Sequence, residues 1–191
     1  MIQDKKTTRE VRICVNLRNL NDACLYDPFP TPFTDEVIES VSRQEMYSFI
    51  DGFSIYHQVR IMKEDRHKMT FITEWGCYQY TVMPFGLKNA PAIFSRIIVS
   101  SFKDFIHKFL EVYFDDWKVF GLVRDHIESL RMMLGRYHQY QITLNSKKCI
   151  FCAPFGVLLG HVVCRNEILV DPLKVATLAT NLHQSRNSDQ C

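Results

Sequence analysis

The chain has 191 residues, of which 47% are hydrophobic and 23% charged, a composition typical of one globular domain. Its 23 lysines and arginines nearly balance 21 aspartates and glutamates, so the formal net charge is only +2. This excludes binding of a polyanion through overall charge, and any nucleic acid must meet a local basic patch. No apolar stretch approaches the roughly 20 residues of a membrane span, so we expect no membrane partner.

Cysteine usage and the N-terminal sequence indicate an intracellular protein that is not secreted. The seven cysteines are an odd number scattered from Cys14 to Cys191, unlike the framework of a disulfide-rich secreted domain. The first residues, Met-Ile-Gln-Asp-Lys-Lys, lack the apolar segment of a secretory signal. We therefore expect free thiols.

In the N-terminal half, apolar alternation predicts strands around one short helix. Thr34 is expected to begin this helix after an extended proline connector at 28–32, and Val37, Ile38 and Val41 supply its buried face. Strands are expected at 11–17, on both sides of a turn near Gly52 within 46–62, at 70–75 and at 78–82.

In the C-terminal half, the apolar spacing becomes helical. Residues after Pro91 predict one long buried helix that reaches Leu110, and the spacing from Ile127 to Tyr137 predicts another. A hairpin at 112–120, interrupted by two aspartates, is expected between them, with strand-like pieces at 150–151 and 157–163. Helices and strands mix without regular βαβ alternation, which predicts the α+β class with a mainly antiparallel sheet backed by helices.

Asp115 and Asp116 in this hairpin are the strongest chemical signal. Adjacent ionised carboxylates in a half-buried turn repel each other unless a cation holds them, and Mg²⁺ takes carboxylate oxygens together with substrate phosphates. Asp51, at the end of an apolar strand, is a suitable third ligand, and two ions held there would support in-line phosphoryl displacement. The competing interpretation is a solvated turn, which spacing alone favours.

Several sequence boxes, in the same order, resemble those of reverse transcriptases from gypsy-type long-terminal-repeat retrotransposons. Tyr113-Phe114-Asp115-Asp116 is similar to the Tyr-x-Asp-Asp box of that family. The other boxes are residues 15–21 of the fingers, 51–59 around the first catalytic aspartate, 83–91 at the start of the palm helix, and 144–149 with 159–161, which lead into the primer grip. The resemblance implies a right-hand polymerase palm with partial fingers and no thumb over residues 1–176. Residues 177–191 are divergent, polar and patternless, which predicts a disordered tail.

The resemblance also implies an RNA-directed DNA polymerase that adds deoxynucleotides (dNTPs) to a primer 3′-hydroxyl on an RNA or DNA template. Asp51, Asp115 and Asp116 would be its catalytic ligands for two Mg²⁺ or Mn²⁺ ions, with Asp116 more peripheral. The implied nucleotide-binding residues are Lys5, Lys6, Arg12, Tyr56 and Phe85, and the implied template or primer contacts are Gly86, Leu159, Gly160 and His161. The missing thumb, RNase H and integrase regions would be encoded nearby, and the protein would act in the cytoplasm, in virus-like particles or in the nucleus.

Each of these roles has a structural alternative. Arg12 could belong to the solvated face of its strand, Tyr56 and Phe85 could be core aromatics, and His161 could be a hydrogen-bonded structural histidine. A third overall interpretation is a structural domain with a zinc clip, because Cys149-x-x-Cys152 and His161-x-x-Cys164 have zinc-type spacing. The resemblance favours free cysteines there.

Five residues depart from the family pattern in ways that bear on activity. Ile55 stands where the family has a small residue, so it would enter the nucleotide pocket and would be strained if its φ were positive. Asn16 replaces an aspartate, Arg43 and Glu167 stand where small residues are expected, and Leu159 stands for phenylalanine. They leave open a catalytically inactive, decayed palm fragment that at most binds nucleic acid.

Overall fold

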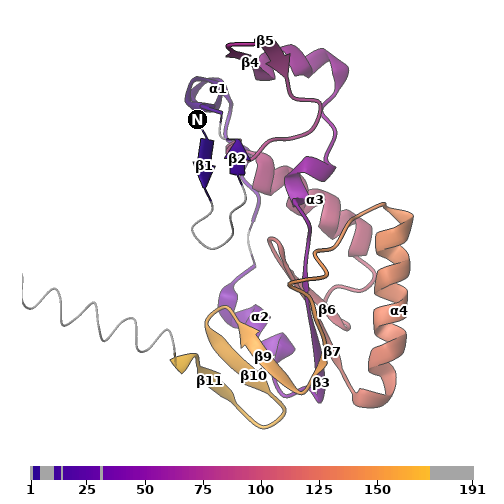
Figure 1. The fold of residues 1–191 in the computed structure, drawn as a ribbon. Helices are drawn as coiled ribbons and strands as arrows, with labels where there is room; N and C mark the ends of the chain where they lie inside the picture. The colour runs from indigo at the N-terminus through magenta and orange to yellow at the C-terminus, as the bar shows by residue number, and fades with distance from the viewer. Residues whose placement is uncertain (1, 5–10, 14, 31, 173–191) are drawn as a thin grey trace, which may run out of the picture. The chain divides into compact units, whose positions relative to one another are not determined.

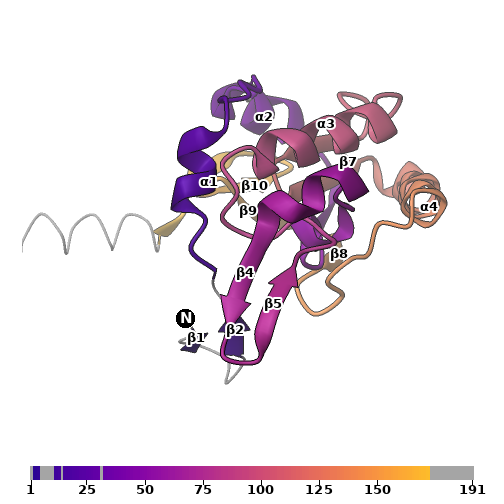
Figure 2. The same cartoon turned by 90° about the horizontal axis from the view of Figure 1, so that it is seen from above.

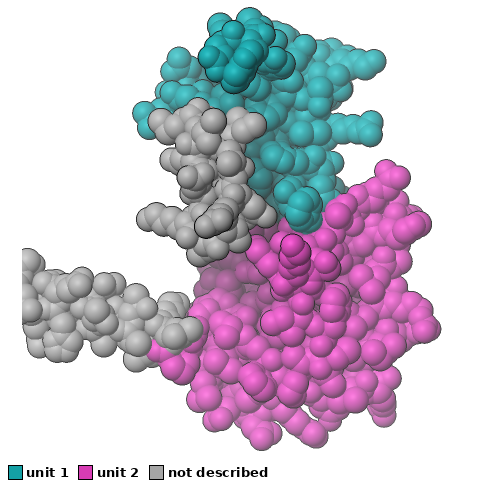
Figure 3. Space-filling model, viewed as in Figure 1, with its two compact units in different colours: residues 1–30, 53–101 teal, residues 31–52, 102–191 magenta. Residues whose placement is uncertain are grey.

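The computed structural model describes residues 2–4, 11–13, 15–30 and 32–172, which belong to two compact units (Figure 3). Unit 1 comprises residues 1–30 and 53–101, and unit 2 comprises residues 31–52 and 102–191. In the part of the chain that is described, no helix combines the length and the apolar character needed to cross a membrane.

The centre of unit 2 is a four-stranded antiparallel sheet in the order β6-β7-β3-β8 (Figure 1). These strands are β6 (Leu110–Tyr113), β7 (Asp116–Gly121), β3 (Met46–Asp51) and β8 (Ile150–Ala153). Helix α4 (Val123–Gln139) covers one face, where the ring of Trp117 lies 5.1 Å from the ring of Tyr137. Both side chains are fully or almost fully buried, so this contact fixes the helix on the sheet.

The opposite face of the same sheet is covered by α2 (Thr34–Val41) and by a three-stranded antiparallel sheet in the order β11-β10-β9. Its strands are β9 (Phe155–Leu158), β10 (His161–Cys164) and β11 (Ile168–Val170). Successive residues of a strand point to opposite faces, so Tyr47 and Phe49 face this side. The core here consists of Val37, Ile38, Val41, Tyr47, Phe49, Phe120, Leu158 and Val163.

Unit 1 combines short strands and short helices with the helix α3 (Ala90–Phe102), which ends at its boundary. The other elements are β1 (Ile2–Asp4), β2 (Val11–Ile13), α1 (Arg18–Ala23), the 3₁₀ helices η1 (Ile55–Gln58) and η2 (Lys63–Met69), β4 (Thr70–Thr73) and β5 (Gly76–Gln79). Figure 2 shows β4 and β5 as a separate hairpin. The side chain of Asn21 bonds to both the carbonyl of Gly86 and the N–H of Lys88, each at 2.8 Å, so residues 15–21 and 83–91 lie together.

The mixture of helices and antiparallel sheets confirms the predicted α+β class, while several predicted boundaries were wrong. The long helix predicted to reach Leu110 ends at Phe102. Apolar residues continue at helical spacing, but His107 has a φ of 64°, which a right-handed helix does not allow. The rings of Phe105 and Phe109 still pack at 5.0 Å, so burial continues without the helix.

Other corrections concern short elements. The strand predicted before residue 62 is the 3₁₀ helix η1 followed by an isolated bridge between Arg60 and Val82. The piece predicted at 157–163 is two strands separated by Leu159 and Gly160, and α1 and β11 were not predicted at all. The predicted disordered tail at 177–191 lies outside the described residues.

Arg43 follows α2 and adopts a left-handed backbone with a φ of 59°, at a position where a small residue was expected. Side chains with a Cβ are disfavoured there by about 1 kcal/mol, so Arg43→Gly should raise the free energy of unfolding by up to about that amount. Denaturant unfolding measures this change. Gln44→Gly, at an ordinary φ, is the matched control and should lower stability; a loss of stability in Arg43→Gly would contradict the assignment of strain.

Candidate active site

Asp51 and Asp116 lie opposite each other at one end of the central sheet. In the β3–β7 register Asp51 is the Cα partner of Asp116, and in the β6–β7 register Asp116 is the partner of Tyr113. Directly opposed residues in an antiparallel pair have Cα atoms about 4.5–5.5 Å apart. Asp115 precedes Asp116 in the hairpin turn. The backbone therefore brings the three aspartates that the sequence predicted to the same place.

The hairpin turn that presents Asp115 is strained. Phe114, the first turn residue, has a φ of 53°, as a type II′ hairpin turn requires at that position, where glycine is preferred. The ring of Phe114 packs edge-on against Tyr113 at 5.0 Å, which stabilises this conformation. Asp115 itself is exposed. Backbone strain of this kind concentrates at functional sites.

Two of the three aspartates form ion pairs with lysines. Lys148 Nζ lies 3.1 Å from Asp51 Oδ2, and Lys118 Nζ lies 3.3 Å from Asp116 Oδ1. The Lys118 side chain is only 7% exposed, whereas that of Lys148 is 64% exposed. Neither lysine was predicted as a site residue. The period of two in β7 places Lys118 on the same face as Asp116, a signal that the sequence contained.

The aspartates fit a divalent metal by donor type and by backbone position. Carboxylate oxygens are the ligands that Mg²⁺ takes, and two of the three aspartates are Cα partners. As the side chains are placed, no three His, Cys, Asp or Glu residues within the described ranges converge closely enough to hold one ion. Lys148 and Lys118 orient the carboxylates of Asp51 and Asp116 instead. Asp51, Asp115 and Asp116 are the candidate ligands because of their donor type and backbone position.

The main chain of Asp51 is held by the segment 144–149, one of the boxes noted in the sequence. The Asn145 N–H donates to the Asp51 carbonyl at 2.8 Å, and the Asp51 N–H donates to Cys149 Sγ at 3.4 Å. Gly52 forms a bridge with Leu144 just beyond. Both main-chain groups of Asp51 are thus satisfied where β3 leaves the sheet, which restrains this residue.

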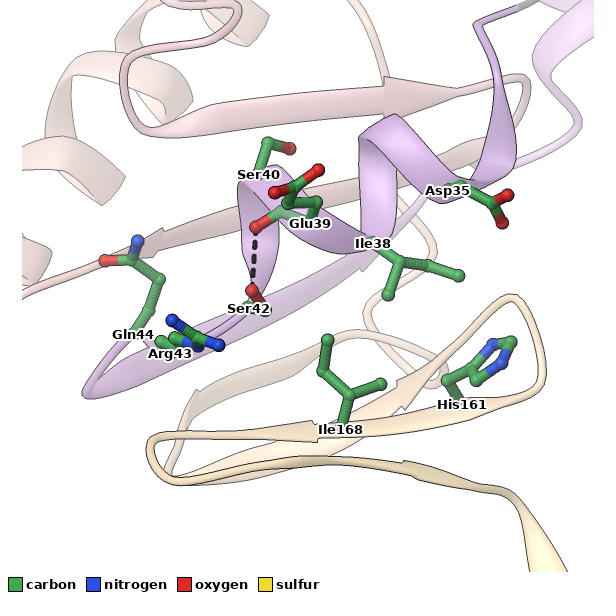
Figure 4. A pocket seen from close by; sticks show the side chains of 9 residues that line it. All are labelled: Asp35, Ile38, Glu39, Ser40, Ser42, Arg43, Gln44, His161 and Ile168. Carbon is green, nitrogen blue, oxygen red and sulfur yellow. Dashed lines mark hydrogen bonds between the residues drawn. The ribbon is translucent and has the colours of Figure 1, made fainter.

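Leu159, Gly160 and His161, the predicted primer contacts, belong to the β9–β10 hairpin. Leu159 and Gly160 have φ values of 51° and 77°, the pattern of a type I′ turn. His161 lines a pocket of about 540 Å³ between α2 and β10–β11. Ile168 and Ile38 face each other across this pocket (Figure 4). The lining residues are Asp35, Ile38, Glu39, Ser40, Ser42, Arg43, Gln44, His161 and Ile168. None of the three candidate ligands is among them, so this pocket is not the candidate catalytic site.

The predicted nucleotide-binding residues are only partly described. In unit 1, the ring of Tyr56 packs edge-on against Phe85 at 5.1 Å, so these two aromatics lie together, and Gly86 follows with a φ of 95°. Lys5 and Lys6 lie outside the described residues, and Arg12 is described only through its backbone in β2.

Ile55 is not strained in the way that a positive φ would have implied. The left-handed residue is its neighbour Ser54, with a φ of 44°, and Ile55 begins η1 at an ordinary φ. The Ile55 side chain is 5% exposed and is therefore buried. Compared with the small residue of the family, Ile55 therefore adds a buried side chain but no backbone strain.

The four residues with zinc-type spacing are dispersed over unit 2. Cys149 contacts the backbone of Asp51, Cys152 is exposed on β8, and His161 and Cys164 lie at the two ends of β10. Cys164 Sγ donates to the carbonyl of Glu167 at 3.2 Å, a local contact within the β10–β11 turn.

His126 of α4 packs against β3, the strand that ends in Asp51. Its side chain is buried at 1% exposure, and its Nε2 lies 2.8 Å from Ser48 Oγ. Ser48 Oγ also accepts the Cys152 N–H at 3.0 Å, so the histidine is part of a buried network joining α4 to β3 and β8. Burial lowers the pKa of His126 below its ordinary value of 6.5, because the charged ring would lose its hydration.

This lowered pKa predicts a loss of stability in acid. Above pH 6.5 the ring is neutral in the folded and unfolded chains alike; below it, the unfolded chain binds the proton more readily, so the free energy of unfolding falls. Melting temperatures measured at pH 8 and at pH 5.5 should therefore differ more for the parent than for His126→Gln. Identical pH dependence in the two proteins would show that His126 does not contribute.

This fold and this arrangement of aspartates define the class of right-hand polymerase palms. Residues 3–179 match the family described as "Reverse transcriptase (RNA-dependent DNA polymerase)". The chain therefore belongs to the reverse transcriptase family, which uses divalent metal ions, and the predicted family is confirmed.

Relatives support the gypsy-type assignment. The chain is 29% identical over 178 residues to the Retrovirus-related Pol polyprotein from transposon 297 of Drosophila melanogaster, covering 93% of this chain and 17% of the relative. It is 27% identical over 168 residues to that from transposon gypsy of the same organism, covering 87% and 16%. Among solved structures, the foamy viral protease-reverse transcriptase in complex with RNA/DNA hybrid is similar, with a TM-score of 0.78 at 19% identity, covering 90% of this chain and 23% of that one.

Proposed function

We propose that this chain is the catalytic palm of an RNA-directed DNA polymerase that adds deoxynucleotides to a primer 3′-hydroxyl. The observation that carries the proposal is the register that places Asp51 opposite Asp116, with Asp115 adjacent. The chain spans about a sixth of the polyproteins it matches, so the proposal concerns nucleotide addition by this palm and not the activities of a whole polyprotein.

Asp51 and Asp115 would hold two Mg²⁺ or Mn²⁺ ions, and Asp116, paired with Lys118, would lie at the edge of the site. When bound, such ions activate the attacking hydroxyl and stabilise charge on the transferring phosphate. The chain's own contribution is positioning: the Phe114 turn presents Asp115, and Asn145 and Cys149 restrain Asp51.

The substrate contacts follow from family membership and from the placement of the aromatics. Tyr56 and Phe85, which pack together in unit 1, would contact the incoming dNTP, with Tyr56 excluding a 2′-hydroxyl by its volume. Lys5, Lys6 and Arg12 would meet the triphosphate. Gly86, Leu159, Gly160 and His161 would contact a template and primer. The foamy viral relative in complex with RNA/DNA hybrid supports nucleic acid as a partner of this palm.

A primer-extension assay on the full chain tests this function. With an annealed primer on an RNA or DNA template, dNTPs and Mg²⁺ or Mn²⁺, the chain should lengthen the primer, and omission of the metal should stop it. Ribonucleotides should be incorporated far less. A chain that binds primer and template without lengthening the primer under any of these conditions would overturn the proposal and identify an inactive palm fragment.

A further inference from the structure

Lys118 is a buried cation on the face of the sheet that carries the candidate ligands. It follows Asp116 by two residues in β7, and side chains two apart on a strand share a face. Its Nζ lies 3.3 Å from Asp116 Oδ1 and 5.1 Å from the centre of the Phe49 ring. Because an unpaired buried ammonium group is strongly disfavoured, Asp116 is the partner that makes its burial tolerable.

The residues on the two neighbouring strands flank the Lys118 side chain and limit its movement into solvent. Its Cα partners are Phe49 on β3 and Glu111 on β6, both buried, so the side chain is enclosed on two sides by the sheet. Lys148, the partner of Asp51, differs in this respect because it is 64% exposed and can rotate into solvent. Exposed ion pairs contribute little. In the Lys118–Asp116 pair the ammonium group is buried while the carboxylate side chain is 54% exposed, so solvent screens this pair in part.

We propose that Lys118 is a built-in counter-ion that competes with a divalent metal for the carboxylate of Asp116. The inference rests on the proposed function, since it concerns the metal requirement of that same site. The ammonium group partly neutralises Asp116, draws its carboxylate toward Lys118, and repels a second cation that approaches it. Lys118 thereby raises the metal concentration that the site needs and restricts the ions to Asp51 and Asp115.

Binding of Mn²⁺ to the full chain, measured by the electron paramagnetic resonance signal of the free ion, tests this without any catalytic readout. Lys118→Met keeps most of the side-chain volume but removes the charge, and it should lower the dissociation constant about fivefold to tenfold. Lys108→Met removes the same charge from an exposed residue before the far end of β6. This control should change the constant by less than about twofold.

The outcomes separate the inference from the proposed function. Mn²⁺ binding by Lys118→Met that is equal to or weaker than the measurable binding of the parent overturns the inference alone. If neither the parent nor Lys118→Met binds Mn²⁺, both the inference and the proposed metal site are overturned. Mn²⁺ binding by Asp115→Asn that equals that of the parent overturns the proposed metal site instead. Should Lys118→Met fail to fold, judged by its thermal unfolding, Lys118→Gln provides the same neutral comparison.

Discussion

Asp115→Asn is expected to lower the rate of nucleotide incorporation by about a thousandfold or more. The amide keeps the size of the side chain but removes the negative charge that holds a cation. The several kcal/mol that a metal contributes to the transition state are then lost, and each 1.4 kcal/mol corresponds to about a factor of ten in rate. Single-turnover primer extension measures the rate, and fluorescence anisotropy of a labelled primer–template should show retained binding, because Asp115 is proposed to contact only metal.

A matched control uses an aspartate of the same unit that the proposed site does not include. Asp104 is exposed and lies 3.5 Å from Arg136, so Asp104→Asn makes the same chemical change in an ordinary surface ion pair. Its incorporation rate should equal that of the parent. A rate for Asp115→Asn above about a tenth of the parent rate would be incompatible with a metal ligand, because the loss would then be below 1.4 kcal/mol.

The parts of the site that could be predicted from sequence are those defined by local patterns. The hairpin around Asp115 and Asp116 and the helix α4 both follow from apolar spacing within a few residues. Asp51 is 64 residues away from Asp115 in the chain, and it was included because it ends an apolar strand and because its box resembles that of a family. Its actual register opposite Asp116 is a property of the folded sheet that spacing does not encode.

The parts that could not be predicted depend on contacts between distant residues. The ion pair of Lys148 with Asp51 joins residues 97 apart, and the burial of Lys118 depends on strands on both sides of β7. The end of α3 was missed because Phe105 and Phe109 remain packed after the helix stops, so hydrophobic spacing no longer reports the backbone. Short elements such as α1, with no buried residue, leave no apolar pattern to detect.

Gly156→Ala is expected to destabilise unit 2 by about 1–3 kcal/mol, or to prevent its folding, because the added methyl group has no space. A Cβ built on Gly156 overlaps the Cζ and Cε2 atoms of the Phe49 ring. Phe49 is 7% exposed and belongs to the core between β3 and β9–β10, so its ring has no solvent to move into. Denaturant unfolding of the full chain measures the loss.

Gly135→Ala is the matched control, with the opposite expected sign. Gly135 lies within α4 with nothing within 4 Å of an added Cβ, so alanine should stabilise the helix by about 1 kcal/mol. Phe49→Leu removes the ring atoms that the methyl group would meet, and the double variant should therefore lose less stability than the sum of the two single changes. Strict additivity would show that the Phe49 ring is not what requires glycine at 156.

The Phe49 ring also lies beneath the Lys118 ammonium group. A Gly156→Ala chain that folds should therefore also have a changed Mn²⁺ affinity, because a displaced Phe49 ring would move the charge beside Asp116.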